Sequence, residues 1–243
     1  MSYISFDKLD EFDVINAYSK KPLDFNFHVL SRKEIDKSLN YLEDEIGYQF
    51  DKVVIPKQSH TTNVVFIDED NVDDEFVDVD GVFTNVKGIG LGTVSADCQT
   101  ILVYDIGKEV VGSVHSGWRG TYNGIIVKAI KEMIDHYNSN VEDIYVCICP
   151  SILQCCFEVD EDVKDMFLDK YGDKYIKKGA IKDDKQKYNI DTVKINIDEL
   201  NKIGVNNVMV PEICVCCGNE DFYSYRADGK DTGRNIGLIG MKK

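Results

Sequence analysis

Three residues that can bind a metal ion, or act as a nucleophile and a base, stand apart from the other cysteines and histidines of the chain. His60 lies in KQSHTT, Cys98 in SADC and His115 in SVHSGWRG. Two imidazoles and one thiolate are zinc ligands, and a three-ligand set leaves a fourth position open. All three lie at predicted strand ends or turns, where a site can stay open. Because no pair has zinc-finger spacing, the residues alone leave a catalytic metal site and ordinary core residues both open.

A predicted β-hairpin brings Cys98 and His115 together. Apolar and polar residues alternate in GLGTVSADC, the apolar run ILVYD follows, and VVGSVH repeats the pattern after the turn IGKE. Without a bulge, this turn pairs Tyr104 with Val110 and places Cys98 nearly opposite His115. A thiol and an imidazole on facing strands are within reach of each other or of one metal ion.

The turn after His115 is a candidate anion site. The segment SGWRGTYNG precedes a helix whose apolar residues recur at helical spacing from Ile125 to Tyr137. Backbone N–H groups at a helix start favour anions, and an arginine adds a bidentate contact to phosphate or carboxylate. We therefore expect Arg119 and the helix start at Thr121 to bind phosphate.

Composition excludes several classes of protein. The chain has 43 acidic and 28 basic residues and a formal net charge of -15, which argues against non-specific binding to nucleic acid or to anionic membranes. It has no apolar segment of signal-peptide type, and no run approaches the roughly 18 apolar residues of a membrane span. We therefore expect a cytoplasmic protein, whose eight cysteines are thiols or ligands and not disulfides.

The remaining pattern predicts one α+β domain over residues 1–243, without a linker or a repeat. Helices are predicted near 31–46, 158–171 and 190–204, and strands in VVI, NVVFI, IYVCICPS and VNNVMVPEICVCC, the last clear strand. Residues 1–30 read as largely irregular, the segment between the last two helices as a charged loop, and the acidic segment 68–81 as a solvated loop.

Seven of the eight cysteines lie toward the C-terminus. If the strands near 144–151 and 205–217 are neighbours, they can form a four-thiolate zinc site from Cys147, Cys149, Cys214 and Cys216. The alternative is that these small thiols fill a hydrophobic core.

Seven motifs occur in order from about residue 52 to the C-terminus: QSH, DGVFTN, ADCQTILVYD, HSGWRGTYNGI, CPSILQCCFEV, YNIDT and FYSYRADGKDTGRN. Together they resemble the family named after its YfiH and laccase-domain members, also called multicopper polyphenol oxidases or purine nucleoside phosphorylases. The ADC and HxGWRG elements are the most specific. The resemblance implies a zinc ion bound by His60, Cys98 and His115.

The resemblance also implies a fold and an activity. The fold is a YfiH-like α+β domain of mixed, largely antiparallel sheets with flanking helices. The activity is phosphorolysis of adenosine, inosine, guanosine and methylthioadenosine, with deamination of adenosine as a second reaction. Its partners are then a small nucleoside and phosphate, with no nucleic acid and no membrane. Zinc with three protein ligands would lower the pKa of a water molecule for the deamination.

Some positions differ from the family pattern. Lys20 stands where the family has an arginine, so the charge is kept but the bidentate fork is lost. We include Lys20 among the expected substrate residues. Cys149 replaces a glycine, and Ala227 replaces the second arginine of the SYRR pattern.

The same residues have three other interpretations to consider. A true multicopper oxidase needs paired histidines, and the chain has four histidines and no HxH, although copper can replace zinc at the same three ligands. A cysteine-type amide hydrolase would use Cys98 as nucleophile and His115 as base, with Asp97 orienting the imidazole. That reading leaves His60 without a role. A non-enzymatic binding module is the third reading, and the sequence does not indicate an oligomeric state.

Overall fold

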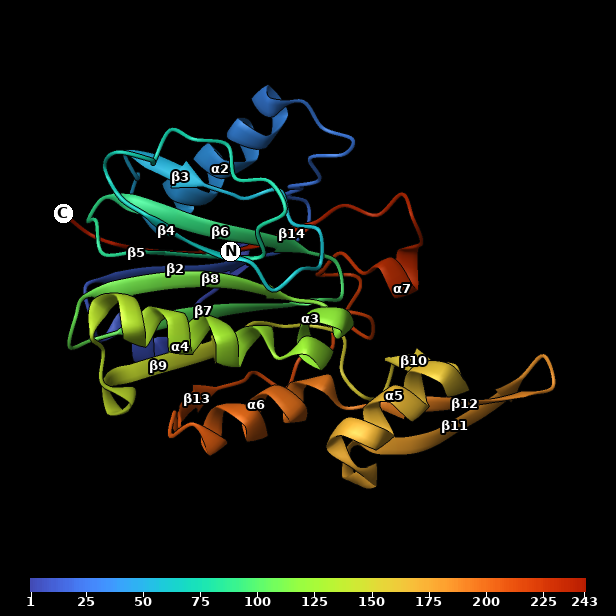
Figure 1. Ribbon diagram of the computed structural model, residues 1–243. Coiled ribbons are helices and arrows are strands. Elements are labelled where there is room, and N and C mark those ends of the chain that lie inside the picture. The colour runs from blue at the N-terminus through green and yellow to red at the C-terminus, as the bar shows by residue number, and fades with distance from the viewer.

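The computed structural model describes all residues, Met1–Lys243, and its core is built in four layers (Figure 1). The first sheet contains, in spatial order, β1 (Tyr3–Ile4), β2 (Val14–Ser19), β14 (Asn235–Met241), β6 (Ile89–Ser95) and β3 (Lys52–Val54). The second contains β13 (Asn207–Met209), β9 (Ile144–Ile148), β7 (Gln99–Asp105), β8 (Val110–Ser116), β5 (Gly81–Thr84) and β4 (Val64–Ile67). Both sheets are mixed and mostly antiparallel. The predicted α+β fold is confirmed.

Helices cover the outer faces of the two sheets. α2 (Arg32–Ile46) packs on the five-stranded sheet, and α4 (Ile125–Tyr137) and α6 (Thr192–Lys202) pack on the six-stranded sheet. Shorter helices are α1 (Asp7–Asp10), α3 (Trp118–Asn123), α5 (Glu161–Tyr171) and α7 (Tyr225–Asp228), with 3₁₀ turns at η1 (Val141–Asp143) and η2 (Asp173–Tyr175). None of the helices combines the length and the apolar character needed to span a bilayer.

The predicted helix near 31–46 forms, and residues at both of its ends cap it. The Ser31 side chain accepts the backbone N–H of Glu34, the Glu34 carboxylate accepts the backbone N–H of Ser31, and Gly47 ends the helix in the left-handed region. Ile35, Leu39 and Leu42 are buried.

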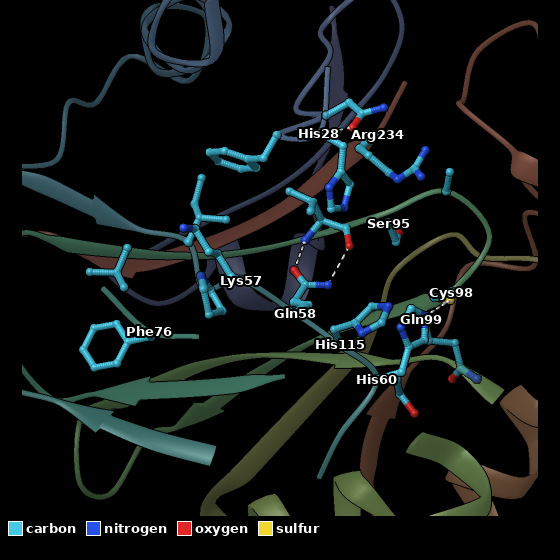
Figure 2. A pocket seen from close by; sticks show the side chains of 18 of the residues that line it. His28, Lys57, Gln58, His60, Phe76, Ser95, Cys98, Gln99, His115 and Arg234 are labelled. Carbon is cyan, nitrogen blue, oxygen red and sulfur yellow. Dashed lines mark hydrogen bonds between the residues drawn. The ribbon is translucent and has the colours of Figure 1, made fainter. Parts of the chain in front are cut away.

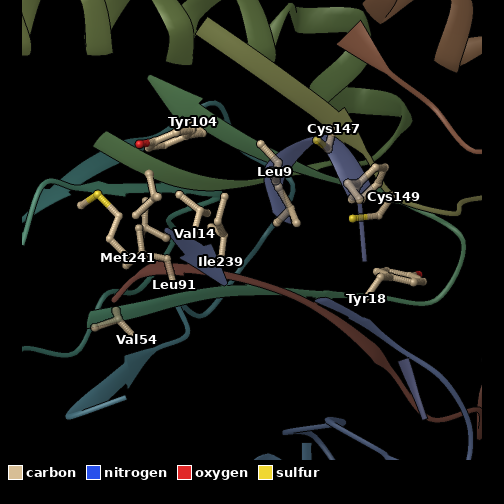
Figure 3. Packing of buried hydrophobic residues seen from close by; sticks show 14 of the residues in the cluster. Leu9, Val14, Tyr18, Val54, Leu91, Tyr104, Cys147, Cys149, Ile239 and Met241 are labelled. Carbon is tan, nitrogen blue, oxygen red and sulfur yellow. The ribbon is translucent and has the colours of Figure 1, made fainter. Parts of the chain in front are cut away.

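The principal core lies between the two sheets (Figure 3). Leu91 and Ile239 from the five-stranded sheet meet Leu102 and Cys147 from the six-stranded sheet. Cys147 and Cys149 are both buried in this core, so they are packing thiols. β7 and β8 have one face toward this core and the other face toward a helix. Because both faces are covered, every residue of these two strands is buried.

Both ends of the chain contribute buried strands that the sequence reading missed. The N-terminal segment supplies β2, all of whose residues are buried, and the C-terminal segment supplies β14, which pairs with β2 and β6 in the middle of the sheet. The prediction that 1–30 is irregular is therefore wrong for β1, α1 and β2, although residues 20–30 form no helix or strand, and 205–217 is not the last strand. Of that segment only β13 is extended, because Pro211 and the following turns end it.

The central hairpin of β7 and β8 forms with a register one residue away from the predicted one. Asp105 faces Val110, whereas Tyr104 was predicted to face it. The Asp105 carboxylate accepts two backbone N–H groups of the turn, which closes the loop at this residue. Cys98 consequently lies just before β7 and diagonal to His115.

A small third sheet with α5 projects from the main body (Figure 1). It consists of β10 (Glu158–Val159), β12 (Lys185–Ile190) and β11 (Ile176–Lys182). The segment predicted as a charged loop thus forms a β-hairpin. Its strands are rich in exposed lysine, so periodicity of apolar residues could not reveal them.

Replacing Leu91 by alanine tests the inter-sheet core. The fully buried leucine would leave a cavity between two sheets that cannot collapse freely, so we expect a loss of about 2–5 kcal/mol in the free energy of unfolding. Urea unfolding followed by circular dichroism measures this loss. Ile181→Ala, at a position that is 71% exposed on β11, is the control and should change the stability by less than about 0.5 kcal/mol. Equal losses in the two variants would contradict the assignment of the core.

Candidate metal centre

His60, Cys98 and His115 come together in the folded chain (Figure 2). One ligand atom from each lies within 4.8 Å of the other two. The Cys98 Sγ is 3.8 Å from the His60 Nε2, and the two imidazole rings meet edge to face with their centroids 4.9 Å apart. The three side chains therefore point toward one common position.

Each residue reaches this position from a different part of the fold. His60 is in the loop between β3 and β4, Cys98 is in the crossover from β6 to β7, and His115 is in β8. Because β6 and β7 belong to different sheets, the crossover carries Cys98 from one layer to the next. The backbone of His60 has a φ of 64°, a left-handed conformation that costs a non-glycine residue on the order of 1 kcal/mol.

The buried carboxylate of Asp80 holds two of the three residues in place. Its Oδ1 is 2.8 Å from the His115 Nδ1 and accepts the backbone N–H of His60 at 3.1 Å. Its Oδ2 accepts both the backbone N–H and the hydroxyl of Thr61, each at 2.7 Å. Since Nδ1 of His115 is bound to Asp80, Nε2 remains to face Cys98. A carboxylate that orients a histidine in this way is typical of metal-binding histidines.

Sequence reasoning placed Asp80 in a solvated acidic loop, and that prediction is wrong for this residue. Asp80 is fully buried at the start of β5. Most of the other acidic residues of 68–81 are exposed, as predicted. Only the position of Asp80 directly before the apolar strand GVF, and not its residue type, distinguishes it from its neighbours.

The ionisable groups of the centre influence one another strongly. Burial alone would raise the pKa of the Cys98 thiol, but hydrogen bonds from His115 and His60 lower it to about 6. Burial would lower the pKa of His115, but hydrogen bonds with Asp80 and Cys98 raise it to about 9. Burial would raise the pKa of Asp80, but hydrogen bonds from His115 and Thr61 lower it to about 2. In the metal-free chain at neutral pH, the thiolate and imidazolium forms are thus favoured.

Gly117 is required by space and not by backbone conformation. A Cβ atom on this residue would lie 2.6 Å from the His60 Cδ2 and 3.1 Å from the Cys98 Sγ. Its φ of -70° is open to any residue. The first glycine of SGWRG, predicted as part of a turn, therefore also makes room for two of the converging side chains.

The three side chains line a cavity of about 1210 Å³. Its apolar lining includes the aromatic side chains of Phe27, Phe76, Trp118, Phe157 and Tyr225. Gln58 also lines it and exchanges two hydrogen bonds with the backbone of Val94, which fixes the loop that leads to His60 (Figure 2). A largely apolar cavity with a few converging polar groups is the usual form of a small-molecule site.

The cavity also has basic side chains that the sequence analysis did not select. Lys52 and Lys57 pair with acidic residues, and Arg32 pairs with Asp36. Arg234 donates through its Nη1 to the backbone carbonyls of Thr232 and Gly233, so Nε and Nη2 remain for a ligand. Figure 2 shows Arg234 beside His28, across the cavity from the three converging residues. The one signal in the sequence that indicates Arg234 is its place in TGRN, at the end of the family-like motif FYSYRADGKDTGRN.

The residues predicted to bind substrate or phosphate lie elsewhere. None of Arg119, Thr121 and Lys20 lines the cavity. The exposed Arg119 guanidinium lies over the Trp118 ring at 4.2 Å, and the Lys20 ammonium is 3.5 Å from Asp221. The helix starts at Trp118 and not at Thr121. Thr121 is therefore inside the helix, where it is buried and its hydroxyl is hydrogen-bonded to that of Ser116 at 3.0 Å.

Asp97 has a structural role that differs from the one considered in the sequence analysis. Its carboxylate accepts the hydroxyl of Ser224 at 2.6 Å and the backbone N–H of Arg226 at 2.7 Å. It is therefore Asp80, and not Asp97, that orients His115. Asp97 instead fixes the C-terminal segment beside Cys98.

The donor set and spacing fit a zinc-type metal ion. Zinc bonds of about 2.3 Å to sulfur and about 2.0–2.1 Å to nitrogen in a tetrahedral arrangement separate the two ligand atoms by about 3.6 Å. The 3.8 Å between the Cys98 Sγ and the His60 Nε2 is close to this value. His60, Cys98 and His115 are thus able to hold such an ion, with Asp80 as the orienting carboxylate.

Comparison with known proteins places the chain among related sequences. Residues 16–242 match the family described as "Multi-copper polyphenol oxidoreductase laccase". A purine nucleoside phosphorylase of Clostridium acetobutylicum is 30% identical over 98% of this chain and 95% of its own length. Adenosine deaminase RL5, from an unknown prokaryotic organism, is 32% identical over 79% of this chain and 76% of its own length.

Solved structures agree on the fold. The crystal structure of YlmD from Geobacillus stearothermophilus has a TM-score of 0.90 and 23% identity to this chain, with 100% of this chain and 97% of that chain covered. At this identity the likeness shows the shared fold alone.

Replacing Asp80 by asparagine tests its role as the orienting carboxylate. Asparagine keeps the size but weakens the hydrogen bond to His115, so we expect zinc affinity to fall about 10–100-fold. Competition titration against a fluorescent chelator measures the affinity. Asp78→Asn is the control, since Asp78 is exposed and has a φ of 57°, which asparagine tolerates. Unchanged affinity in Asp80→Asn would contradict this role.

Proposed function

The chain belongs to the multi-copper polyphenol oxidoreductase laccase family, as its motifs predicted, and we propose that it is a zinc-dependent purine nucleoside phosphorylase. The proposed substrates are adenosine, inosine, guanosine and methylthioadenosine, and deamination of adenosine is a second reaction. The observation that carries the proposal is the convergence of His60, Cys98 and His115 in one cavity. The names of relatives at about 30% identity support the substrate class.

The metal centre is proposed to use all three side chains as ligands. His60 and His115 provide imidazole nitrogens, and Cys98 provides a thiolate that is already favoured at neutral pH. A zinc ion bound by three protein ligands supplies a Lewis acid with one position open for water or substrate. Asp80 keeps the His115 imidazole oriented, and the Gln58 contacts hold the loop that carries His60.

Phosphorolysis needs an anion site and a place for the base. In this reaction a phosphate oxygen forms a bond to C1′ of the ribose, and the bond from C1′ to the base nitrogen breaks with its electron pair. We assign phosphate to the free donors of Arg234, with His28 beside it. The aromatic cavity wall offers faces on which a purine can stack. Deamination instead adds water to the ring carbon and releases ammonia.

The family description does not extend to multicopper oxidation in this chain. A trinuclear copper centre needs many paired histidines, and the chain has four. His60 and His115 are in the centre, His28 lines the cavity, and His136 stacks on Phe66 with centroids 4.0 Å apart. Copper is therefore proposed only as a substitute for zinc at the three ligands.

A cysteine-type amide hydrolase is the second candidate. Cys98, with its low pKa, would be the nucleophile, and His115 would be the base. Asp80, which is hydrogen-bonded to His115, would orient the imidazole. In this candidate His60 has no chemical role, although its imidazole is as close to the sulfur as a shared metal would require. We therefore rank it below the metal enzyme.

The reaction is tested with purified, zinc-loaded protein and adenosine. With phosphate present, we expect adenine and ribose 1-phosphate, whereas without phosphate we expect only inosine and ammonia. Chromatography of the products distinguishes these outcomes. Absence of both adenine and inosine would reject the proposed function. These substrates are small cytoplasmic molecules, so the proposal requires neither a nucleic-acid nor a membrane partner.

Replacing His60 by alanine separates the two candidate functions. Two remaining ligands are too few to hold a catalytic zinc tightly, so metal and turnover should fall together, and Cys98 should be alkylated faster. Zinc analysis, peptide mapping after alkylation and turnover are measured on one preparation. If wild type and variant are equally active and neither has zinc bound by Cys98, the hydrolase candidate replaces the metal enzyme.

Arg234→Ala tests the proposed anion site. Loss of a charged hydrogen-bond donor, worth about 1.5–3 kcal/mol, should raise the KM for phosphate roughly 10–100-fold, since each 1.4 kcal/mol is a factor of ten. Zinc content should stay unchanged. Arg119→Ala is the matched control, because Arg119 is exposed outside the cavity. A larger effect from Arg119 than from Arg234 would restore the original phosphate assignment.

A further inference from the structure

A second group of cysteines converges away from the candidate centre. Cys155 and Cys156 lie in the turn before β10, and Cys214 and Cys217 lie in the turns after β13. All four Sγ atoms lie within 4.8 Å of one another. We call these four residues the cysteine cluster.

We propose that the cysteine cluster is a structural zinc site in which four thiolates enclose one ion. The Sγ of Cys217 is 3.7 Å from that of Cys155 and 3.4 Å from that of Cys156. Tetrahedral zinc with bonds of about 2.3 Å to sulfur separates its sulfur ligands by about 3.8 Å. The four thiols are therefore spaced almost as an ion between them would require.

Burial argues against an ordinary packing role for these thiols. Cysteines that fill a core are buried, as Cys147 and Cys149 are. In the cluster only Cys214 is buried, whereas Cys155 and Cys217 are exposed and Cys156 is half-buried. Hydrophobic burial therefore does not explain why four sulfur atoms meet near the surface.

The backbone around the cluster is arranged as it is around metal-bound thiolates. Cys214 and Cys217 have the Cys-x-x-Cys spacing of many zinc sites, and the backbone N–H of Gly218 closes the turn on the Cys214 carbonyl. The N–H of Leu153 points at the Cys214 Sγ at 3.4 Å. Such donors stabilise the negative charge of a bound thiolate.

The sequence analysis considered a different set of four cysteines. It combined Cys147 and Cys149 with Cys214 and Cys216, on the premise that all four lie on two neighbouring strands. The strand β9 ends at Ile148, and Cys214 lies in an isolated bridge to Ser151 followed by turns, not in a strand beside β9. Of the four, only Cys214 joins the cluster.

An ion in the cluster would join the segment before β10, which borders the cavity, to the turns after β13. Arg226 donates to the carbonyls of Cys156 and Glu158, and its own backbone N–H reaches Asp97, the neighbour of Cys98. Phe157 and Arg226 both line the cavity. The second site would thus stabilise one wall of the cavity without touching the substrate. The charge of the thiolates and the ion would lie beside the Arg226 guanidinium.

Zinc counting in matched variants tests the proposal. The full-length chain is loaded with Zn²⁺, freed of excess metal on a chelating resin, and analysed by mass spectrometry for zinc per chain. We expect Cys217→Ser to bind one zinc fewer than the wild type. Cys216→Ser is the control, because this thiol lies in the same turn but outside the cluster, and it should lose none. Equal zinc in Cys217→Ser and wild type would overturn the proposal.

A His60→Ala protein keeps the test independent of the candidate centre and of the folding of any cysteine variant. The cysteine cluster is intact in this variant, so the protein should retain one zinc ion. When cobalt replaces this zinc ion, the protein should show the intense ultraviolet charge-transfer bands of a metal bound by several thiolates. His60→Ala with no tightly bound zinc would overturn the second site, whatever the activity of the wild type. So would a disulfide within the cluster of the zinc-loaded protein, found by thiol titration after denaturation.

Discussion

The centre of this protein depends on one buried carboxylate. Asp80 has no exposure to solvent, and each of its oxygens accepts more than one hydrogen bond. A buried charge is tolerated only when it is satisfied in this way. The contacts fix the loop of His60, which has a strained backbone, and the imidazole of His115. Cys98 needs no such contact, because the crossover between the two sheets determines its position.

The position of the site follows from the layering of the sheets. The loops after β3 and β6 and the end of β8 meet at one end of the inter-sheet core. The core rigidly positions these ends, and the loops are free to carry polar side chains. The cavity wall is completed by segments far away in sequence, such as those with Phe27 and Arg234. Because the net charge is -15, basic groups with free donors in the cavity, such as Arg234, are important for any anionic substrate.

Seven of the eight cysteines fall into three environments with different consequences. Cys147 and Cys149 are buried, so their thiols stay neutral, as burial raises the pKa of each above its usual value. Cys98 has a lowered pKa of about 6 because imidazoles surround it. The cysteine cluster lies near the surface, where the turns before β10 and after β13 meet. Residue type alone is the same in all three, and the environment decides whether a thiol packs, binds metal or reacts.

Elements with strong local signals could be predicted from the amino-acid sequence. Ser31, Glu34 and Gly47 specify a helix through contacts within a few residues, and the apolar runs around Tyr104 and Val110 specify a hairpin. The QSH, ADC and HSGWRG motifs indicated three residues that do converge, and the family followed from the motifs. Local patterns could not show that β14 fills the middle of a sheet, because its hydrogen-bond partners are distant in sequence.

Which polar residues lie together depends on long-range packing that local patterns do not contain. Asp80 looks like its exposed acidic neighbours until β5 buries it, and Arg234 reaches the cavity only because β14 returns to the centre of its sheet. Arg119 lies four residues after His115, but its exposed guanidinium lies over the Trp118 ring and does not line the cavity. Proximity along the chain and proximity in space differ wherever long-range strand pairing sets the geometry. Sequence motifs named the candidate ligands, and packing of the two sheets decided what surrounds them.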